Sequence, residues 1–342
     1  MITENPQQPL VSVIIPVKNG SKTLTQCIRS VKRSYYRNFE IIVIDDHSSD
    51  NSADIARGLQ CTVIAATDGT GANNARNIGA RTARGDILMF VDADILVRRD
   101  TMLEIVETLE EPYIDAVVGI YTARHRHESF VSQYKNLWVR YSYLKSTPAI
   151  DWLFGSISGI KRNAFEKLGG FDVELLARHG HDDIELGKRF ARARLNITLN
   201  MDIEVEHLKN YNLGSFIKNE FHRSFGFASL AVRFRETAKS FRMGFVNVYP
   251  EFVLSTLFSV FVLAAIVALV IGYLPNWYAF AAAGIYLLLN IRFLNYLEQV
   301  RGLFAMMFMI PYLFLDHLVC LAGSIVGTLH GILRQKKSIE LK

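Results

Sequence analysis

The sequence is poor in cysteine and lacks the short motifs of the commonest nucleotide-binding enzymes. Its 342 residues include only Cys27, Cys61 and Cys320. These have no metal-ligand spacing and form no disulfide framework, as expected in a reducing compartment. Neither a Gly-x-Gly-x-x-Gly sequence nor a Walker A sequence occurs. Their absence disfavours a Rossmann dehydrogenase and a P-loop NTPase.

The first ten residues, Met1 to Leu10, are polar and lack the apolar run of a secretory signal peptide. We therefore expect the first 245 residues to stay in the cytoplasm. The length allows one large domain and a further part. Internal repeats and low-complexity linkers are also absent from the sequence.

Formal charge is missing from long stretches near the C-terminus. Phe252 to Leu274 is a run of 23 uncharged residues, and Asn276 to Ile291 adds 16 more. Leu303 to Leu333 is apolar apart from Asp316, His317 and His330. About 20 apolar residues cross a bilayer as a helix. The sequence thus predicts an all-α membrane domain at 251–342 with two or three transmembrane helices, in the plasma or inner membrane. Whether 303–333 spans the membrane or re-enters after a break at Pro311 stays open.

A basic segment precedes these runs. The stretch from Lys209 to Arg242 contains seven Lys and Arg residues and only two acids. Its net charge of +5 equals that of the whole chain. Such a helix, rich in phenylalanine, favours an interfacial segment at 211–250 lying on anionic membrane lipid. Nucleic acid is the competing partner of a basic patch, but the adjacent apolar runs favour lipid. Three arginines could hold a lipid or acceptor phosphate, or only anchor the helix to headgroups: Arg223, Arg233 and Arg235.

The remaining N-terminal part alternates short apolar runs with helical patterns. This order predicts an α/β fold with a doubly wound, mostly parallel, Rossmann-like sheet. The expected strands are residues 10–16, 39–44, 62–66, 87–91 and 116–120. The expected helices are residues 21–33, 52–59, 72–83 and 101–109.

Carboxylates follow directly on one of the expected strands. Five apolar residues, 87–91, end in Asp92-Ala93-Asp94, and open sheets of this kind bind ligands beyond the carboxyl ends of their strands. Paired oxygen ligands suit Mg²⁺ or Mn²⁺. Taken alone, two such aspartates are explained equally well by a turn in which their side chains accept hydrogen bonds from the nearby backbone. Two further strands also end in polar clusters, at 16–19 and 45–46, and ordinary turn chemistry explains three such ends at one sheet edge less easily.

Taken in order, these motifs resemble the family 2 glycosyltransferases. The resemblance covers residues 10–210 and is carried by five ordered motifs. They are Val13-Ile14-Ile15-Pro16-Val17-Lys18-Asn19, Val43-Ile44-Asp45-Asp46, Ala75-Arg76-Asn77 with Gly85-Asp86 and Asp92-Ala93-Asp94, Gly169-Gly170-Phe171-Asp172, and His181-Asp182-Asp183-Ile184-Glu185-Leu186. The resemblance implies a cytoplasmic GT-A domain at 1–210 and a UDP- or GDP-linked sugar as donor.

Roles for individual residues also follow from the resemblance. The nucleobase and ribose would lie against Pro16, Val17, Asn19, Asp45 and Asp46. Arg76 would lie near the base or diphosphate, and Asp92 at the ribose or the water shell of the metal. A divalent cation, Mn²⁺ or Mg²⁺, would be held by Asp94 and His207. The bound cation would neutralise the departing diphosphate.

The Asp182-Asp183 pair resembles the acidic pair in which the second carboxylate is the general base; Asp182 stands where glutamate is commoner. A sugar or alcohol hydroxyl must lose its proton as it attacks, and Asp183 would take it. One base and one leaving group imply a single displacement with inversion. The dipole of a helix also stabilises acids at its start, and this alone would explain Asp182 and Asp183 without any catalytic role.

The acceptor separates the remaining hypotheses. In the first hypothesis the acceptor is a hydroxyl on a lipid-linked saccharide or glycolipid, in the synthesis of the cell envelope, and this hydroxyl needs a general base. A polyprenyl phosphate acceptor is already anionic and does not. A transport or scaffold protein with a degenerate transferase domain is the non-enzyme alternative, although every motif position still holds a competent side chain. The sequence does not give the sugar, the nucleotide, the acceptor or the oligomeric state, and an oligomer stays possible.

Overall fold

The structure is a computed structural model, and it describes residues 8–67, 71–173, 182–234, 249–273 and 275–340. The chain divides into two compact units. The first comprises residues 1–124, 146–178 and 182–209, and the second residues 125–145, 179–181 and 210–342. Residues 125–145 thus group with the C-terminal part, a division that the sequence does not reveal.

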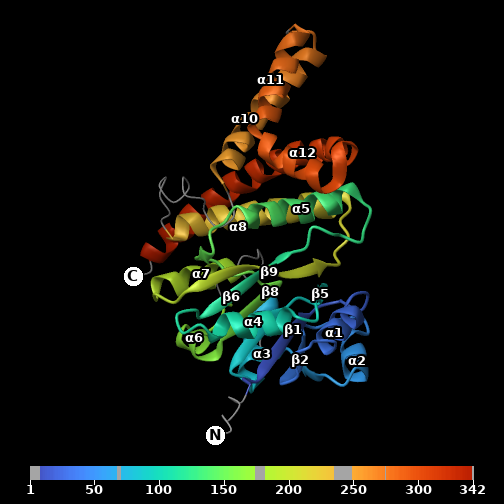
Figure 1. The fold of residues 1–342 in the computed structure, drawn as a ribbon. Helices are drawn as coiled ribbons and strands as arrows, with labels where there is room; N and C mark the ends of the chain where they lie inside the picture. The colour runs from blue at the N-terminus through green and yellow to red at the C-terminus, as the bar shows by residue number, and fades with distance from the viewer. Residues whose placement is uncertain (1–7, 68–70, 174–181, 235–248, 274, 341–342) are drawn as a thin grey trace. The chain divides into compact units, whose positions relative to one another are not determined.

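The first unit is built on a nine-stranded mixed sheet (Figure 1). Its strands are β1 Val11–Val17, β2 Phe39–Asp45, β3 Thr62–Ala65, β4 Ile87–Val91, β5 Ile95–Val97, β6 Ala116–Tyr121, β7 Ala149–Ile150, β8 Ile157–Lys161 and β9 Ile197–His207. They follow the order β3-β2-β1-β4-β8-β6-β9-β5, with β7 also on β9. Strands β3, β2, β1 and β4 run parallel, as do β6 and β9. The remaining pairings are antiparallel. The expected GT-A-type α/β fold is confirmed, with its parallel half in the N-terminal strands.

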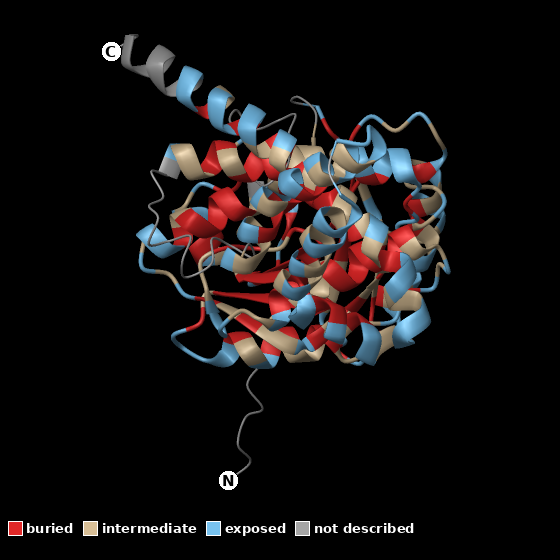
Figure 2. Ribbon diagram, turned by 90° about the horizontal axis from the view of Figure 1, so that it is seen from above, coloured by how far each residue is buried: buried red, intermediate tan, exposed pale blue. Residues whose placement is uncertain are grey.

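Helices of this unit cover the sheet. They are α1 Leu24–Lys32, α2 Ser52–Gly58, α3 Ala72–Thr82, α4 Thr101–Glu110, α6 Arg162–Lys167 and α7 Asp182–Arg192. Every residue of β1 and β4 is buried, as expected of central strands covered on both faces. Figure 2 shows this burial along the strands, with exposed residues on the outer helical turns. A rigid sheet edge therefore carries the polar residues that follow the strands.

The second unit is helical. It contains α5 Phe130–Leu144, α8 Leu213–Phe234, α10 Pro250–Val270, α11 Asn276–Leu289 and α12 Ile291–Glu340. Glycines at every fourth position of α12 bring its backbone against α8: a Cβ on Gly323 or Gly327 would collide with backbone atoms of Phe221 or Phe225. Small residues at this spacing are a common way for helices to approach closely. The pattern is visible in the sequence as Gly323-x-x-x-Gly327-x-x-x-Gly331.

Two helices are long and apolar enough to cross a membrane, Pro250–Val270 and the stretch Ile291–Leu333, while Asn276–Leu289 is apolar but shorter. Large apolar side chains on α10 and α11 are exposed, among them Phe261, Val270 and Phe280. The backbone of α12 is broken at Gly302, which has φ of 83°. Of the two alternatives left open for 303–333, the one with a break at Pro311 is not observed, because the helix continues through that proline and through Asp316.

Candidate active site

The ends of β1 and β2 meet because the two strands are parallel neighbours with Val17 opposite Asp45. The Asp46 N–H donates to the Val17 carbonyl at 2.8 Å. Asn19 and His47 both have positive φ, 54° and 57°, a conformation that short polar side chains tolerate. Asn19 Oδ1 accepts the Ser49 N–H at 2.7 Å. The two turns therefore form one fixed surface.

The carboxylates of this surface differ in what they contact. Asp46 is buried and accepts the Gly71 N–H at 3.0 Å and Lys18 Nζ at 3.4 Å. It therefore ties the end of β2 to the start of α3. Asp45 is half-buried, and among the described residues its carboxylate accepts the Ser48 N–H, at 3.3 Å. Pro16 and Val17 are buried in β1, so a nucleotide could meet them chiefly through the backbone.

Asp92 and Arg76 form an ion pair in which the guanidinium is buried and the carboxylate is half-buried. Arg76 Nη2 lies 2.7 Å from Asp92 Oδ1, and Ser156 Oγ donates to Asp92 Oδ2 at 2.9 Å. The same guanidinium reaches the Gly155 carbonyl at 3.3 Å. Its Nε is buried and has no partner within the described chain. Arg76 is thus a residue of the site and not a solvent-exposed helix arginine.

Asp94 and His207 are brought together by the pairing of β5 with β9, in which Ile95 lies opposite His207. His207 Nε2 is 3.4 Å from Asp94 Oδ2. Burial alone would raise the pKa of Asp94, but His207 and Lys209 hold it below its ordinary value. The Tyr121 ring stacks on His207 with centroids 4.7 Å apart. A carboxylate and an imidazole side by side are ligands that Mn²⁺ accepts.

Asp183 lies in the first turn of α7. Its Oδ2 accepts the Gly155 N–H at 2.8 Å and its Oδ1 accepts the N–H of Ile184 at 2.9 Å. Burial raises the pKa of Asp183, against the opposing effects of Gly155 and Arg76. Asp182 starts α7, but its side chain lies outside the described part of the structure.

One residue, Gly155, connects Asp183 to the rest of the site. Its N–H donates to Asp183 while its carbonyl accepts from Arg76. A Cβ at this position would lie 2.8 Å from Arg76 Nη2, so a larger side chain would displace the guanidinium. Ser156 continues the network, because its Oγ also lies 2.9 Å from the Tyr121 hydroxyl. The network therefore runs from Asp183 through Arg76, Asp92 and Tyr121 to His207 and Asp94.

Sequence reasoning missed Gly155, Ser156 and Tyr121. The last residue of β6 is Tyr121, and Gly155-Ser156 directly precedes β8. Their place at strand ends was the one available indication. Nothing in their residue type distinguishes them from ordinary turn residues.

The three arginines expected to bind lipid phosphate are placed differently. Arg233 is exposed near the end of α8, and Arg235 lies outside the described residues. Arg223 is largely enclosed, with 10% of its side chain exposed, and has Nε 2.7 Å from Glu220 and its guanidinium 4.2 Å from the Trp138 ring. Its Nη2 lies 3.6 Å from Asp316. The placement of Arg223 inside the helical unit gives no support to a lipid role.

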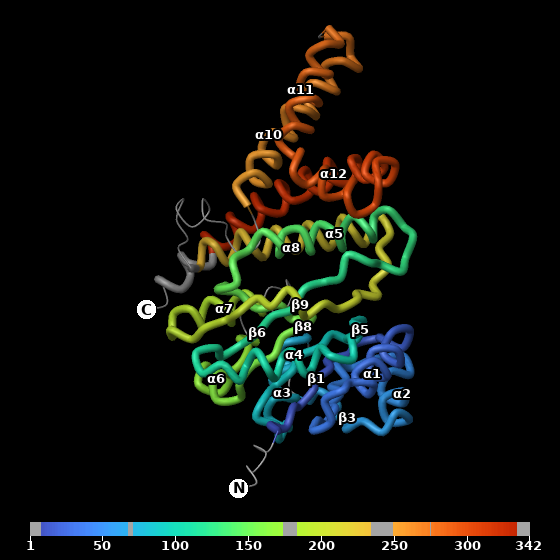
Figure 3. The backbone as a smooth tube through the Cα atoms, viewed as in Figure 1, coloured from blue at the N-terminus to red at the C-terminus, as the bar shows by residue number. Residues whose placement is uncertain are grey.

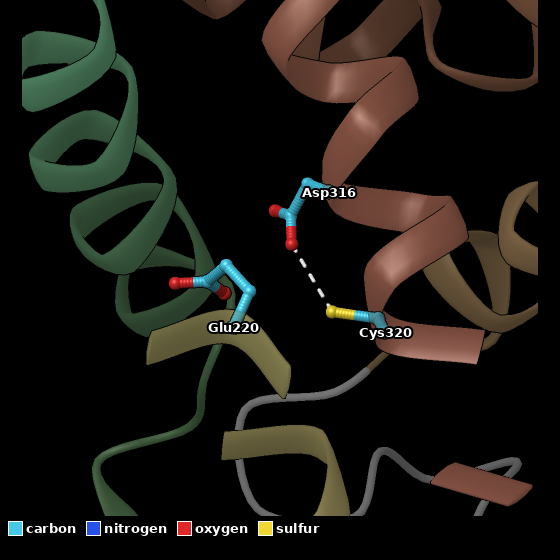
Figure 4. Close-up of side chains that lie close together, drawn as sticks. All are labelled: Glu220, Asp316 and Cys320. Atoms are coloured by element: carbon cyan, nitrogen blue, oxygen red, sulfur yellow. Dashed lines mark hydrogen bonds between the residues drawn. The ribbon is translucent and has the colours of Figure 1, made fainter. Parts of the chain in front are cut away.

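Glu220, Asp316 and Cys320 lie close together (Figure 4), with ligand atoms all within 4.8 Å of one another. Cys320 donates to Asp316 at 3.1 Å. Lys135 Nζ and Arg223 already neutralise Glu220 and hold its pKa below the ordinary value despite burial. This is a structural ion cluster between α5, α8 and α12, and two resident cations leave a metal ion no favourable place.

We expect Arg223→Leu to destabilise the protein by about 3–5 kcal/mol, because it leaves buried carboxylates with one cation too few. Thermal unfolding of the purified full-length protein in detergent measures this. Lys218→Ala, on the exposed side of the same helix, should change the free energy of unfolding by less than about 0.5 kcal/mol. Equal stability of the two variants would contradict the cluster's role.

Known proteins resemble this chain in sequence and in fold. Residues 12–169 match the family described as glycosyl transferase family 2, and residues 137–212 match one described as N-terminal domain of galactosyltransferase. Glycosyltransferase GlyG of Streptococcus pneumoniae is 32% identical over 117 residues, which are 33% of this chain and 39% of that protein. The 4,4′-diaponeurosporenoate glycosyltransferase of Staphylococcus haemolyticus is 28% identical over 202 residues, 55% of this chain and 53% of that protein. The first three relatives are matched over only 37–40% of their own length.

A solved structure is similar over nearly the whole chain. It is the mannosyltransferase PcManGT from Pyrobaculum calidifontis in complex with GDP-Man and Mn²⁺. The TM-score is 0.57 at 21% identity, with 96% of this chain and 88% of that chain covered. At this identity the likeness establishes the fold.

Proposed function

We propose that the protein moves a sugar from a nucleoside-diphosphate sugar to an acceptor hydroxyl, with inversion. The match of residues 12–169 to glycosyl transferase family 2 supports this. The observation that carries the proposal is a chain of contacts from Asp183 to the Asp94–His207 pair. Hydrogen bonds join Asp183 through Gly155, Arg76, Asp92 and Ser156 to Tyr121, and the Tyr121 ring stacks on His207. These contacts hold a proton acceptor and a set of metal ligands at fixed positions in one unit. Preorganised groups of this kind lower the barrier without rearrangement during reaction.

The donor would bind at the turns after β1 and β2. Asp45 has acceptor capacity left for a ribose or base, and Asn19 and Asp46 hold the surface in shape. Arg76 is the group we assign to the diphosphate, since its guanidinium is a cation held among the residues of the site by Asp92 and Gly155. Asp92 keeps the guanidinium in place through the 2.7 Å ion pair.

A divalent cation fits the donor set of Asp94 and His207. When bound, it would neutralise negative charge on the leaving diphosphate. Tyr121 stacked on His207 fixes the plane of the imidazole. The similarity of fold to a transferase solved with GDP-Man and Mn²⁺ supports this assignment.

Asp183 would act as the base. As the acceptor oxygen bonds to the anomeric carbon, the bond to the diphosphate breaks and the hydroxyl proton passes to the Asp183 carboxylate. The Gly155 N–H holds that carboxylate in one orientation. A single displacement of this kind inverts the anomeric configuration.

For the acceptor we propose a lipid-linked saccharide or glycolipid presented to a membrane-anchored enzyme. Two helices of sufficient length and apolarity support the anchoring. A relative whose name gives 4,4′-diaponeurosporenoate as substrate supports an apolar acceptor. On this proposal the catalytic domain faces the cytoplasm.

The test supplies the full-length protein with UDP-, GDP- and dTDP-sugars and Mn²⁺ or Mg²⁺. Release of nucleoside diphosphate is followed with and without a host lipid extract. We expect one donor to be turned over, faster with lipid and not at all in EDTA. The proposal is abandoned if no donor is consumed under any condition. If the rates are equal with and without lipid, the lipid-linked acceptor is contradicted, while the transferase activity itself is not.

A further inference from the structure

Within the helical unit a small pocket lies among α5, α10, α11 and α12. Its wall is largely aromatic, from Trp138, Tyr141, Tyr249, Phe252 and Phe293, and its free volume is about 50 Å³. One water needs about 10–15 Å³ on this measure. The pocket therefore has room for a group of a few heavy atoms.

Two cations and one acid also line this pocket. Lys145 Nζ lies 3.3 Å from Glu251 Oε1, and Arg292 Nη1 lies 3.1 Å from the same oxygen. Lys145 Nζ is also 4.4 Å from the centre of the Tyr249 ring. The lining residues include no second acid. The pocket thus carries one positive charge in excess, and both cations converge on a single carboxylate oxygen.

The position of the pocket in the helical unit adds to its charge. α10 and α11 run side by side as a hairpin (Figures 1 and 3). Tyr249 precedes the first residue of α10 and Asn290 follows the last residue of α11, so the pocket lies at the open end of the hairpin. The 21 residues of α10 span about 31 Å, close to the hydrocarbon thickness of a bilayer, about 30 Å. With the hairpin inserted, its open end lies at headgroup depth.

We infer that this pocket binds the phosphate of an anionic lipid. Guanidinium and ammonium groups at the membrane interface are the usual partners of lipid phosphate. A phosphate oxygen would take the place of, or sit beside, Glu251 Oε1 between Lys145 and Arg292. The aromatic wall would contact the adjoining glycerol and acyl carbons, as aromatic side chains do at membrane interfaces. The inference goes beyond the proposed function, since it holds whatever acceptor the catalytic unit uses.

The test uses the full-length protein in detergent and short-chain phosphatidic acid, with phosphatidylcholine of the same chain length and inorganic phosphate as comparisons. Fluorescence of Trp138, which lines the pocket, and native mass spectrometry report binding. We expect saturable binding of phosphatidic acid, tighter than that of phosphatidylcholine or of free phosphate. In Lys145→Gln with Arg292→Gln it should weaken by about 30-fold, the loss expected for two cations near a lipid surface.

Two further variants make the result independent of folding defects. Glu251→Gln removes the competing acid and should strengthen binding, which a misfolded protein would not do. Lys167→Gln removes an exposed cation of the first unit, outside the basic segment and the pocket lining, and should leave binding unchanged.

Unchanged binding in the double variant, or equal binding of phosphatidylcholine, would overturn the inference. Inorganic phosphate binding as tightly as phosphatidic acid would overturn the lipid assignment. Because the readout is lipid binding, a failure here is distinct from a failure to consume a nucleotide sugar.

Discussion

Asp183→Asn is expected to lower the rate of sugar transfer to a hydroxyl acceptor by about 10²–10⁴-fold, the usual contribution of a general base. The amide oxygen can still accept the Gly155 N–H that the carboxylate accepts at 2.8 Å, so the fold and the donor site should survive. The capacity to take a proton is lost, together with the local bond from the Ile184 N–H. The rate constant at saturating donor measures the effect, and donor affinity should change little.

The pH profile gives an independent signature of this carboxylate. Burial raises the pKa of Asp183, and the charged form is the active one. Wild-type activity should therefore fall as the pH drops through that raised pKa, at a higher pH than for an ordinary aspartate, about 3.9. The residual activity of Asp183→Asn should lack this decline.

A control and a contrary outcome complete the test. Asp54→Asn changes an exposed, ion-paired aspartate on α2 and should leave the rate within about twofold of wild type. Full activity of Asp183→Asn towards polyprenyl phosphate would instead favour the phosphate acceptor, since that nucleophile has no proton to lose.

Asp94→Asn is expected to weaken Mn²⁺-dependent binding of the donor by about 100-fold or more. Even residues that only orient a metal ligand cost about 10–100-fold when changed, and Asp94 would be a direct ligand. Removing its charge also leaves His207, 3.4 Å away, as the single remaining protein ligand of the pair. Calorimetric titration of the nucleotide sugar with Mn²⁺ and with EDTA measures the difference.

The metal assignment fails if Asp94→Asn binds the donor equally well in Mn²⁺ and EDTA with wild-type affinity. His207→Ala should weaken the same binding in the same direction, because it removes the imidazole. Glu107→Gln, exposed on α4, removes a carboxylate from the same unit and should have no effect. Together these variants separate a specific ligand loss from a change in net charge.

The sequence by itself determined the strand ends and the acids placed on them. Apolar runs such as 87–91 identify buried strands, and parallel neighbours necessarily bring Val17, Asp45 and Asp92 to one edge of the sheet. The ordered motifs then indicated the family, and the resemblance to that family implied the role of Asp183. Local patterning was sufficient for these residues because their positions follow from the strand or helix that carries them.

Only the tertiary structure decided which side chains join them. Gly155, Ser156 and Tyr121 link Asp183 to the rest of the site through hydrogen bonds between residues that are 28 to 79 positions apart in the sequence. Arg223 likewise lies between Glu220 and Asp316, a placement that the sequence did not indicate. A helical pattern gives the periodicity of a face, but the partner of that face depends on how distant segments pack. The same holds for Lys145 and Arg292, which meet at Glu251 only after α5, α10 and α12 are assembled.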